Sequence, residues 1–525
     1  MERSEQSMGP FVAHTDTNII RIWYRAGLEN LNDPRRLVAR IYANESASHK
    51  EEKEFNFLNN YDHIGLIEFG TDCVLEEDTT YIYRIGFIDH DERFLPFSED
   101  SVKTFSEDLN KSISFICGSC RHLYVNHANG GISSLENLDG DVKYGDRAFR
   151  SIYESADGLP DLMIMTGDQV YCDHEEGSIV STNPAKTIEE YYDNYYRAYQ
   201  QPYFSKLGSK IPFFMSMDDH EIKNDWHMDM IMNTYNGYTD NRVHYENGVK
   251  SYLAYQASLS SVISNVTDIE NNLDKLSNVS YEISIEEGES PYEDTTKGLF
   301  YKYSHGPAKF FSLDVRAERY MGQFSPQMIG EMQKQALEEW LLENRDDEYV
   351  KFIITAVPMF PDTKNVFFYP FGAPEDKWGG FCEQRIEILD FIRTNNIRKV
   401  VFVSGDVHVS LFSTLLYNNQ DIGVYSIISS GLSWPVPGLQ RFNFDWKNIP
   451  KESIYRSGKR VPNTAKRGKY KPVKLSKWKY FKTGHREHNY CRVETNGNTL
   501  RVKYFTARDG IEFENIEVIL QRYHS

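Results

Sequence analysis

Cysteine, positive charge and long apolar runs are all scarce in this sequence. Six cysteines in 525 residues are too few and too scattered for a disulfide framework. The formal charge of −19 argues against a general nucleic-acid-binding or anionic-membrane-binding protein. No window approaches the roughly 18 apolar residues of a membrane helix, and residues 1–14 lack the basic and apolar regions of a signal peptide. We therefore expect a cytoplasmic protein without a membrane span.

Aromatic residues are abundant, and they exclude a disordered chain: the sequence holds 35 Tyr and 31 Phe. Its length exceeds one ordinary domain of roughly 100–200 residues. Over residues 1–105, short β-branched and aromatic runs alternate with polar stretches, which predicts a small all-β sandwich of immunoglobulin or fibronectin type. The runs are Ile19–Tyr24, Leu37–Tyr42, Ile64–Phe69 and Tyr81–Ile88.

The pattern changes after this first predicted domain, because strands then alternate with helices. Predicted helices are Arg147–Ser155, Ile188–Leu207, Pro326–Asn344 and Glu383–Thr394, and predicted strands include Lys309–Leu313, Val350–Val357 and Val424–Ser429. This alternation predicts a layered α/β domain over residues 106–525, with helices around its sheets. Asn496-Gly497, between two alternating runs, is a hairpin signal.

Four apolar, strand-like runs each end in a burst of residue types that bind metal ions. They are Ile113–Cys120, Asp161–Asp173, Ile211–Asn224 and Val400–His408. Loops that leave the carboxyl ends of strands converge in α/β sheets, so four such bursts predict a single site at a sheet edge. Oxygen, nitrogen and sulfur ligands suit metal ions, for which phosphate chemistry is a natural use.

The individual residues have distinct chemistry. The two oxygens of the Asp168 carboxylate can bridge two ions, and Cys120 would bind as a thiolate. Tyr171 is a ligand only where a strongly acidic ion such as ferric iron lowers its pKa. Asp406 and His408 are spaced so that both side chains can point the same way from an extended segment. Taken singly, each residue has a simpler interpretation as a helix cap, a core residue or a hydrogen-bonding histidine. The metal site is absent only if all of these simpler interpretations are true at once.

The segments GSCR, GDQVY, DDHEIKND and SGDVH together resemble the signature of the PhoD-type alkaline phosphatases, a branch of the calcineurin-like metallophosphoesterases. Ala308–Arg319, Gln333–Leu341 and Asp376–Phe381 are similar to further segments of that family, so the resemblance covers most of the chain. It implies a β-sandwich ahead of a metallophosphoesterase-like catalytic domain. It also implies metal-dependent hydrolysis of phosphoric esters by a metal-bound hydroxide.

The resemblance further implies a role for each matching residue. A ferric ion would be held by Cys120, Asp168, Tyr171 and His408, and calcium by Asp168, Asp219 and Asp406. His220 would stabilise or protonate the leaving oxygen, Asn224 would contact phosphate or metal, and Arg121 would bind the substrate phosphate. Manganese, magnesium or zinc would suit several of these ligands too.

Several alternatives remain open at this point. A phosphodiesterase or nuclease could use the same ions, with nucleic acid as a substrate, and a binding protein could keep a decayed catalytic domain. Cys117 and Cys120 could form a redox C-x-x-C pair. The basic segment 451–482, with interleaved aromatic residues, could recruit a polyanionic phosphoester instead of a small one, or merely wrap the domain.

Overall fold

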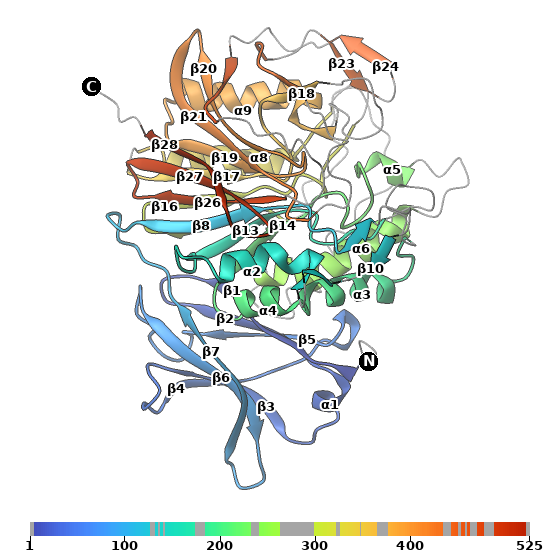
Figure 1. The fold of residues 1–525 in the computed structure, drawn as a ribbon, viewed down its shortest axis with the longest axis vertical. Helices are drawn as coiled ribbons and strands as arrows, with labels where there is room; N and C mark the ends of the chain where they lie inside the picture. The colour runs from blue at the N-terminus through green and yellow to red at the C-terminus, as the bar shows by residue number, and fades with distance from the viewer. Residues whose placement is uncertain are drawn as a thin grey trace.

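The chain builds a pair of N-terminal antiparallel sheets and, above them in Figure 1, two larger sheets flanked by helices. The computed structural model describes residues 5–126, 132–134, 137–139, 142–173, 184–232, 241–262, 299–321, 326–346, 348–364, 376–433, 443–449, 453–456, 459–462, 470–476 and 488–520.

The N-terminal sheets form a sandwich. One sheet has the order β1(Met8–Thr15)-β2(Ile20–Arg25)-β5(Ile64–Phe69), and the other β4(His49–Glu54)-β3(Arg36–Tyr42)-β6(Thr80–Ile88)-β7(Phe94–Lys103). Every pairing within them is antiparallel. Val12 and Ile22 from the first sheet pack against Ile41 and Tyr83 from the second. The four predicted runs therefore all form strands of a sandwich.

Two larger sheets supply the strands of the α/β region. The first has the order β14(Phe213–Ser216)-β13(Leu162–Thr166)-β8(Ile113–Gly118)-β26(Asn489–Thr495)-β27(Thr499–Thr506)-β28(Glu512–Ile519). The second has the order β15(Tyr301–His305)-β16(Ala308–Ser312)-β17(Val350–Ile354)-β19(Val400–Ser404)-β21(Gln420–Ser429)-β20(Ser410–Tyr417)-β25(Tyr470–Lys474). Strands β14, β13 and β8 are mutually parallel, as are β16, β17, β19 and β21.

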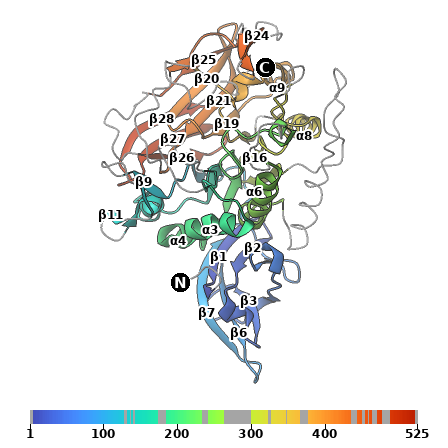
Figure 2. The same ribbon diagram turned by 90° about the vertical axis from the view of Figure 1, so that its right-hand side faces the viewer.

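These two sheets face each other between layers of helices. Apolar side chains of both sheets, such as Phe115 and Phe352, whose ring centroids lie 5.0 Å apart, share one core. Helices α2(Arg147–Tyr153), α3(Ile188–Tyr199), α4(Pro202–Gly208) and α6(Asn241–Tyr255) cover the outer face of the first sheet (Figure 1). Figure 2 shows α3, α4 and α6 between that sheet and the N-terminal sandwich. Helices α8(Glu331–Glu343) and α9(Cys382–Thr394) cover the second sheet. The predicted layered α/β architecture is confirmed.

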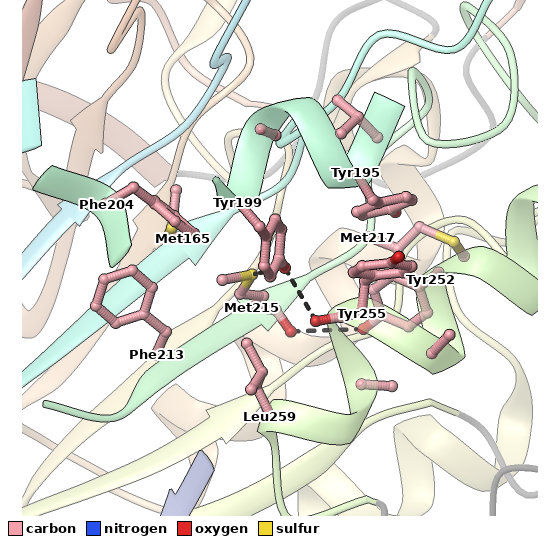
Figure 3. Packing of buried hydrophobic residues seen from close by; sticks show 14 of the residues in the cluster. Met165, Tyr195, Tyr199, Phe204, Phe213, Met215, Met217, Tyr252, Tyr255 and Leu259 are labelled. Atoms are coloured by element: carbon pink, nitrogen blue, oxygen red, sulfur yellow. Dashed lines mark hydrogen bonds between the residues drawn. The ribbon is translucent and has the colours of Figure 1, made fainter. Parts of the chain in front are cut away.

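Buried tyrosines account for much of the packing beneath α3 and α6 (Figure 3). Tyr195 stacks on Tyr255 with ring centroids 4.8 Å apart, and the Tyr199 hydroxyl donates to the Tyr255 carbonyl at 2.9 Å. A buried phenol keeps a polar atom that needs a partner, and here a backbone carbonyl, the Asp62 carboxylate and the Gln256 amide provide it. The aromatic content of the sequence thus builds the layer that supports β13 and β14.

Two predicted helices differ from those observed. Residues 188–207 form two helices, because Gln201 precedes Pro202 and its backbone is extended (ψ 132°), as steric contact with a following proline favours. The helix predicted from Pro326 begins at Glu331, since Gln327 pairs with Tyr320 in a β-bridge. The Asn496-Gly497 hairpin is confirmed, with Gly497 at φ +81° between β26 and β27.

Strands β7 and β8, on either side of residue 105, belong to different sheets. The division into domains 1–105 and 106–525 stays a prediction. Among the helices that the structure describes, none combines the length and the apolar character needed to cross a membrane.

Candidate metal centre

The four segments that predicted a site meet at the carboxyl ends of parallel strands. Cys120 follows β8, Asp168 follows β13, Asp219 follows β14, and Asp406 follows β19 of the facing sheet. The loops are tied together, because the Cys120 amide donates to the Gly167 carbonyl at 3.3 Å. The Asp406 amide also donates to Ser119 Oγ at 3.2 Å, which links the two sheets.

Four candidate ligands have a left-handed backbone. The φ angles are +56° at Cys120, +56° at Asp168, +63° at Asp406 and +51° at His408. This conformation costs a residue other than glycine about 1–3 kcal/mol, and such residues concentrate at functional sites. Surrounding hydrogen bonds hold it, including one from the His408 amide to Ser430 Oγ at 3.0 Å. Other described residues such as Asp62 and Asn396 share this backbone, but the four candidate ligands have it together at neighbouring strand ends.

Asp168 lies at the middle of the group and is only 2 % exposed. Its Oδ2 accepts from Cys120 Sγ at 3.2 Å and from the Tyr171 hydroxyl at 3.3 Å. Its Oδ1 is buried and has no hydrogen-bond partner among the described residues. A buried carboxylate oxygen without a partner is costly, and a metal ion would satisfy it. This donor set fits a metal ion.

Burial raises the pKa of all three groups, the Asp168 carboxyl, the Cys120 thiol and the Tyr171 phenol, well above their usual values. Nearby carboxylates add to the shift at each position. A cation at the centre would reverse these effects, because it favours the anionic form of every ligand around it.

Fixed cations already balance other carboxylates nearby. Arg316 is fully buried, and its Nε lies 2.6 Å from Asp218 while its Nη1 lies 2.7 Å from Asp376. Asp168 has no Lys or Arg ion pair within the described part of the chain. Ligand atoms of Asp168, Asp219 and His220 all lie within 4.8 Å of one another, as do those of Asp219, Asp225 and Asp376. Arg316 also lies 3.6 Å from Asp219, which belongs to both groups. Because the first group contains Asp168, whose charge no described lysine or arginine balances, it is the better metal site.

His220 is held by a carboxylate that sequence reasoning left without a role. Its Nδ1 lies 2.8 Å from Oδ1 of Asp173. The other oxygen of Asp173, Oδ2, accepts from the backbone amide of Asn224 at 2.5 Å. The imidazole packs on Tyr171 with ring centroids 4.2 Å apart. Burial alone would lower the pKa of His220, but Asp173, Asp219 and Asp168 raise it well above its usual value. The structure therefore orients the imidazole and favours its protonated form.

Arg121 does not join this group. Its guanidinium is fully buried, donates from Nη2 to the Ala198 carbonyl at 2.6 Å, and lies over the rings of Phe149 and Phe204. Burial lowers the pKa of this side chain to about 10. Only the backbone of Arg121 reaches the centre, through an amide that donates to the Asp168 carbonyl at 2.7 Å. These contacts give no support to the predicted phosphate-binding role of its side chain.

The redox alternative for Cys117 and Cys120 is not supported either. Cys120 contacts Asp168, whereas Cys117 Sγ lies 2.8 Å from Sγ of Cys491, its register partner on β26. The two cysteines of the C-x-x-C motif thus have different contact partners, and no contact between their two sulfur atoms is found among the described residues.

Glu221 is a second carboxylate without a role in the sequence prediction. It is fully buried and accepts from the amides of Gln169 at 2.7 Å, Asp218 at 2.9 Å and Asp168 at 3.1 Å. Gln256 Nε2 donates to it at 2.9 Å. One carboxylate therefore clamps the loops that carry Asp168 and Asp219. Its only signal in the sequence is that it follows His220 directly.

We expect Glu221→Gln to weaken metal binding about 10–100-fold, the usual effect of losing a residue that orients ligands. The amide keeps the shape of the side chain but replaces one accepting oxygen with a donor. Titration of metal into metal-free protein measures the effect. Glu190→Gln is the matched control, because Glu190 accepts backbone amides at the start of α3, away from the centre. Wild-type metal affinity in Glu221→Gln would contradict the clamp.

Facing sheets with clustered carboxylates at the ends of their parallel strands define a metallophosphoesterase-like fold. Residues 142–438, more than half of the chain, match the PhoD-like phosphatase family. The chain belongs to this family, and it is a metal-dependent phosphoric ester hydrolase.

Two solved structures are similar in fold. A structure of PhoD matches with a TM-score of 0.63 and 14 % identity, over 98 % of this chain and 91 % of that one. The purple acid phosphatase PPD1 from seeds of yellow lupin (Lupinus luteus) matches with a TM-score of 0.54 and 12 % identity, over 98 % of this chain and 74 % of that one. No curated protein matches the chain.

Proposed function

We propose that the centre built around Asp168 hydrolyses the phosphoester, with His220 as its general acid. The observation that carries the proposal is the Asp168 carboxylate, which is buried, touched by Cys120 and Tyr171 on one oxygen, and without a hydrogen-bond partner in the described structure on the other. Bound metal ions would supply a nucleophile at neutral pH and neutralise charge on the phosphoryl oxygens.

The proposed ligands form two sets, and Asp168 belongs to both. Cys120 and Tyr171 contact its Oδ2 and would hold one ion with it. Asp219 lies close enough to Asp168 to share a second ion. Asp406, which follows β19 of the facing sheet, is proposed as a further ligand of that ion. His408 follows Asp406 in the same strained loop and is proposed as a further ligand of the first ion. Ferric iron and calcium are the proposed ions, since a phenolate and a thiolate suit the former and carboxylates the latter.

His220 and its neighbours would deliver a proton to the leaving oxygen. Asp173 engages Nδ1, so the imidazole would pass a proton to the leaving oxygen from Nε2. Asn224 shares Asp173 through its backbone, which places the residue beside His220 for contact with phosphate or metal. No side-chain nucleophile is needed, so we expect no phosphoenzyme to accumulate.

If Tyr171 binds ferric iron, phenolate-to-metal charge transfer should colour the protein, and Tyr171→Phe should bleach it while the fold stays intact. The visible absorption spectrum and iron content of both proteins measure this. Tyr199→Phe is the matched control, because the Tyr199 hydroxyl is also buried but bonds a backbone carbonyl in the helical layer. A colourless, iron-free and fully active wild type would exclude this ligand set and favour zinc, manganese or magnesium.

A phosphodiesterase or nuclease activity of the same ions is the second candidate. The observation in its favour is the basic segment 451–482, but most of that segment lies outside the described residues, so its role in recruiting a polyanion stays a prediction. Hydrolysis of p-nitrophenyl phosphate beside bis-p-nitrophenyl phosphate, with and without chelator, separates the two activities. A cytoplasmic location also stays a prediction.

A further inference from the structure

Lys377 lies at the metal centre on a firmly anchored turn. It precedes the 3-10 turn Trp378–Gly380, and its carbonyl accepts from the Gly380 amide at 2.7 Å. The neighbouring Trp378 is fully buried and donates from its indole to Thr355 Oγ1 at 3.0 Å. The Lys377 ammonium lies 2.6 Å from Oδ2 of Asp406 and 3.7 Å from Oδ2 of Asp376. A lysine held in this way loses little side-chain entropy when it meets a substrate.

The other cations near these carboxylates are enclosed. The side chains of Arg316 and Arg319 are 0 % exposed, and they pair with Asp218 and Asp376. The side chain of Lys377 is 7 % exposed, and that of its partner Asp406 is 17 % exposed. Among described Lys and Arg residues that pair with these carboxylates, Lys377 alone presents side-chain surface to solvent.

The ammonium also has hydrogen-bonding capacity to spare. It carries three donors, whereas its contacts within the described structure are to two carboxylates. A phosphoryl group bound beside Asp406 would offer an oxygen acceptor to the third. Arg121, the cation that the sequence predicted for this task, points into the helical layer instead.

We propose that Lys377 binds the phosphoryl group and makes phosphomonoester dianions the preferred substrates. This inference rests on the proposed function of the Asp168 centre. A monoester carries nearly two negative charges at neutral pH because its second pKa is about 6, whereas a diester carries one. A fixed, largely buried ammonium attracts the doubly charged group more strongly, since the Coulomb energy grows with charge and with removal from water.

Lys377→Met tests the proposal, because it removes the charge and keeps an unbranched side chain. We expect kcat/KM for p-nitrophenyl phosphate to fall about 10²–10³-fold, the effect of removing one group that stabilises developing charge. For bis-p-nitrophenyl phosphate, which has the same leaving group, we expect a fall at least tenfold smaller. Metal content should stay at the wild-type level, and Lys377→Arg, which keeps the charge, should recover part of the monoester activity.

Lys334→Met is the matched control, since Lys334 on α8 forms an ion pair with Glu387 on α9, and both helices cover the second sheet. It should leave the ratio of monoester to diester activity unchanged. If Lys377→Met fails to fold, Lys377→Gln, which can still bond to Asp406, should show the same shift in that ratio.

Equal losses on both substrates together with loss of metal would overturn the proposal, and would mean that Lys377 only neutralises Asp406. Unchanged kinetics would overturn it too. A wild-type protein without chelator-sensitive hydrolysis would instead refute the proposed function. Calorimetric titration of the metal-loaded protein with inorganic phosphate then decides on Lys377 separately: weaker binding to Lys377→Met supports the contact, and equal binding refutes it.

Discussion

An Asp168→Ala variant should have no measurable phosphatase activity and a reduced metal content. Asp168 lies between the other candidate ligands, in contact with Cys120 and Tyr171 and close to Asp219. A ligand that serves two ions cannot be lost without weakening both, so binding and chemistry should fail together. Metal analysis of the purified variant and turnover of p-nitrophenyl phosphate measure the two effects.

Asp161→Asn is the matched control for this variant. The Asp161 carboxylate accepts from the Ser114 amide at the amino end of β13, whereas Asp168 follows the carboxyl end of the same strand. We expect it to keep its metal and its activity, even if its thermal stability falls. Near-normal turnover in Asp168→Ala would refute the assignment of the centre.

A His220→Ala variant should keep most of its metal and lose about 10²–10⁴-fold in kcat, the usual contribution of a general acid. Asp173→Asn should also lower kcat, because an uncharged amide replaces the carboxylate that faces His220 Nδ1. The decisive comparison is metal content, since His220 lies within reach of an ion held by Asp168 and Asp219. Equal metal loss in His220→Ala and Asp168→Ala would make His220 a ligand and not the acid.

The sequence predicted that the ends of these strands would meet, because a strand can be recognised from a short run of residues. A strand is recognised by its apolar run, and its carboxyl end must lie at the same edge as those of its parallel neighbours. The proximity of Cys120, Asp168 and Asp219 could therefore be predicted without any knowledge of side-chain contacts. The strands that escaped prediction show the limit of such patterns. Strand β4, with the sequence HKEEKE, has no apolar alternation and is recognisable only through its pairing with β3.

Side-chain direction was the part that could not be predicted. Cys120 faces Asp168, whereas the side chain of Arg121 extends among the helices that cover the first sheet. The left-handed backbone at Cys120 breaks the regular alternation of a strand, so sequence spacing could not assign these directions. Asp173 and Glu221 could not be told from metal ligands, because a carboxylate that accepts a backbone amide or an imidazole looks the same in sequence. Lys377 meets Asp406 only through tertiary structure, as the two lie on different segments of the fold.

The most direct test of the central claim is to remove the metal with a chelator, restore it stepwise, and follow hydrolysis of p-nitrophenyl phosphate against the metal bound. We predict that activity disappears with the metal and returns in proportion to it, and that Asp168→Ala recovers none. Full activity in protein shown by analysis to be free of metal would contradict the account.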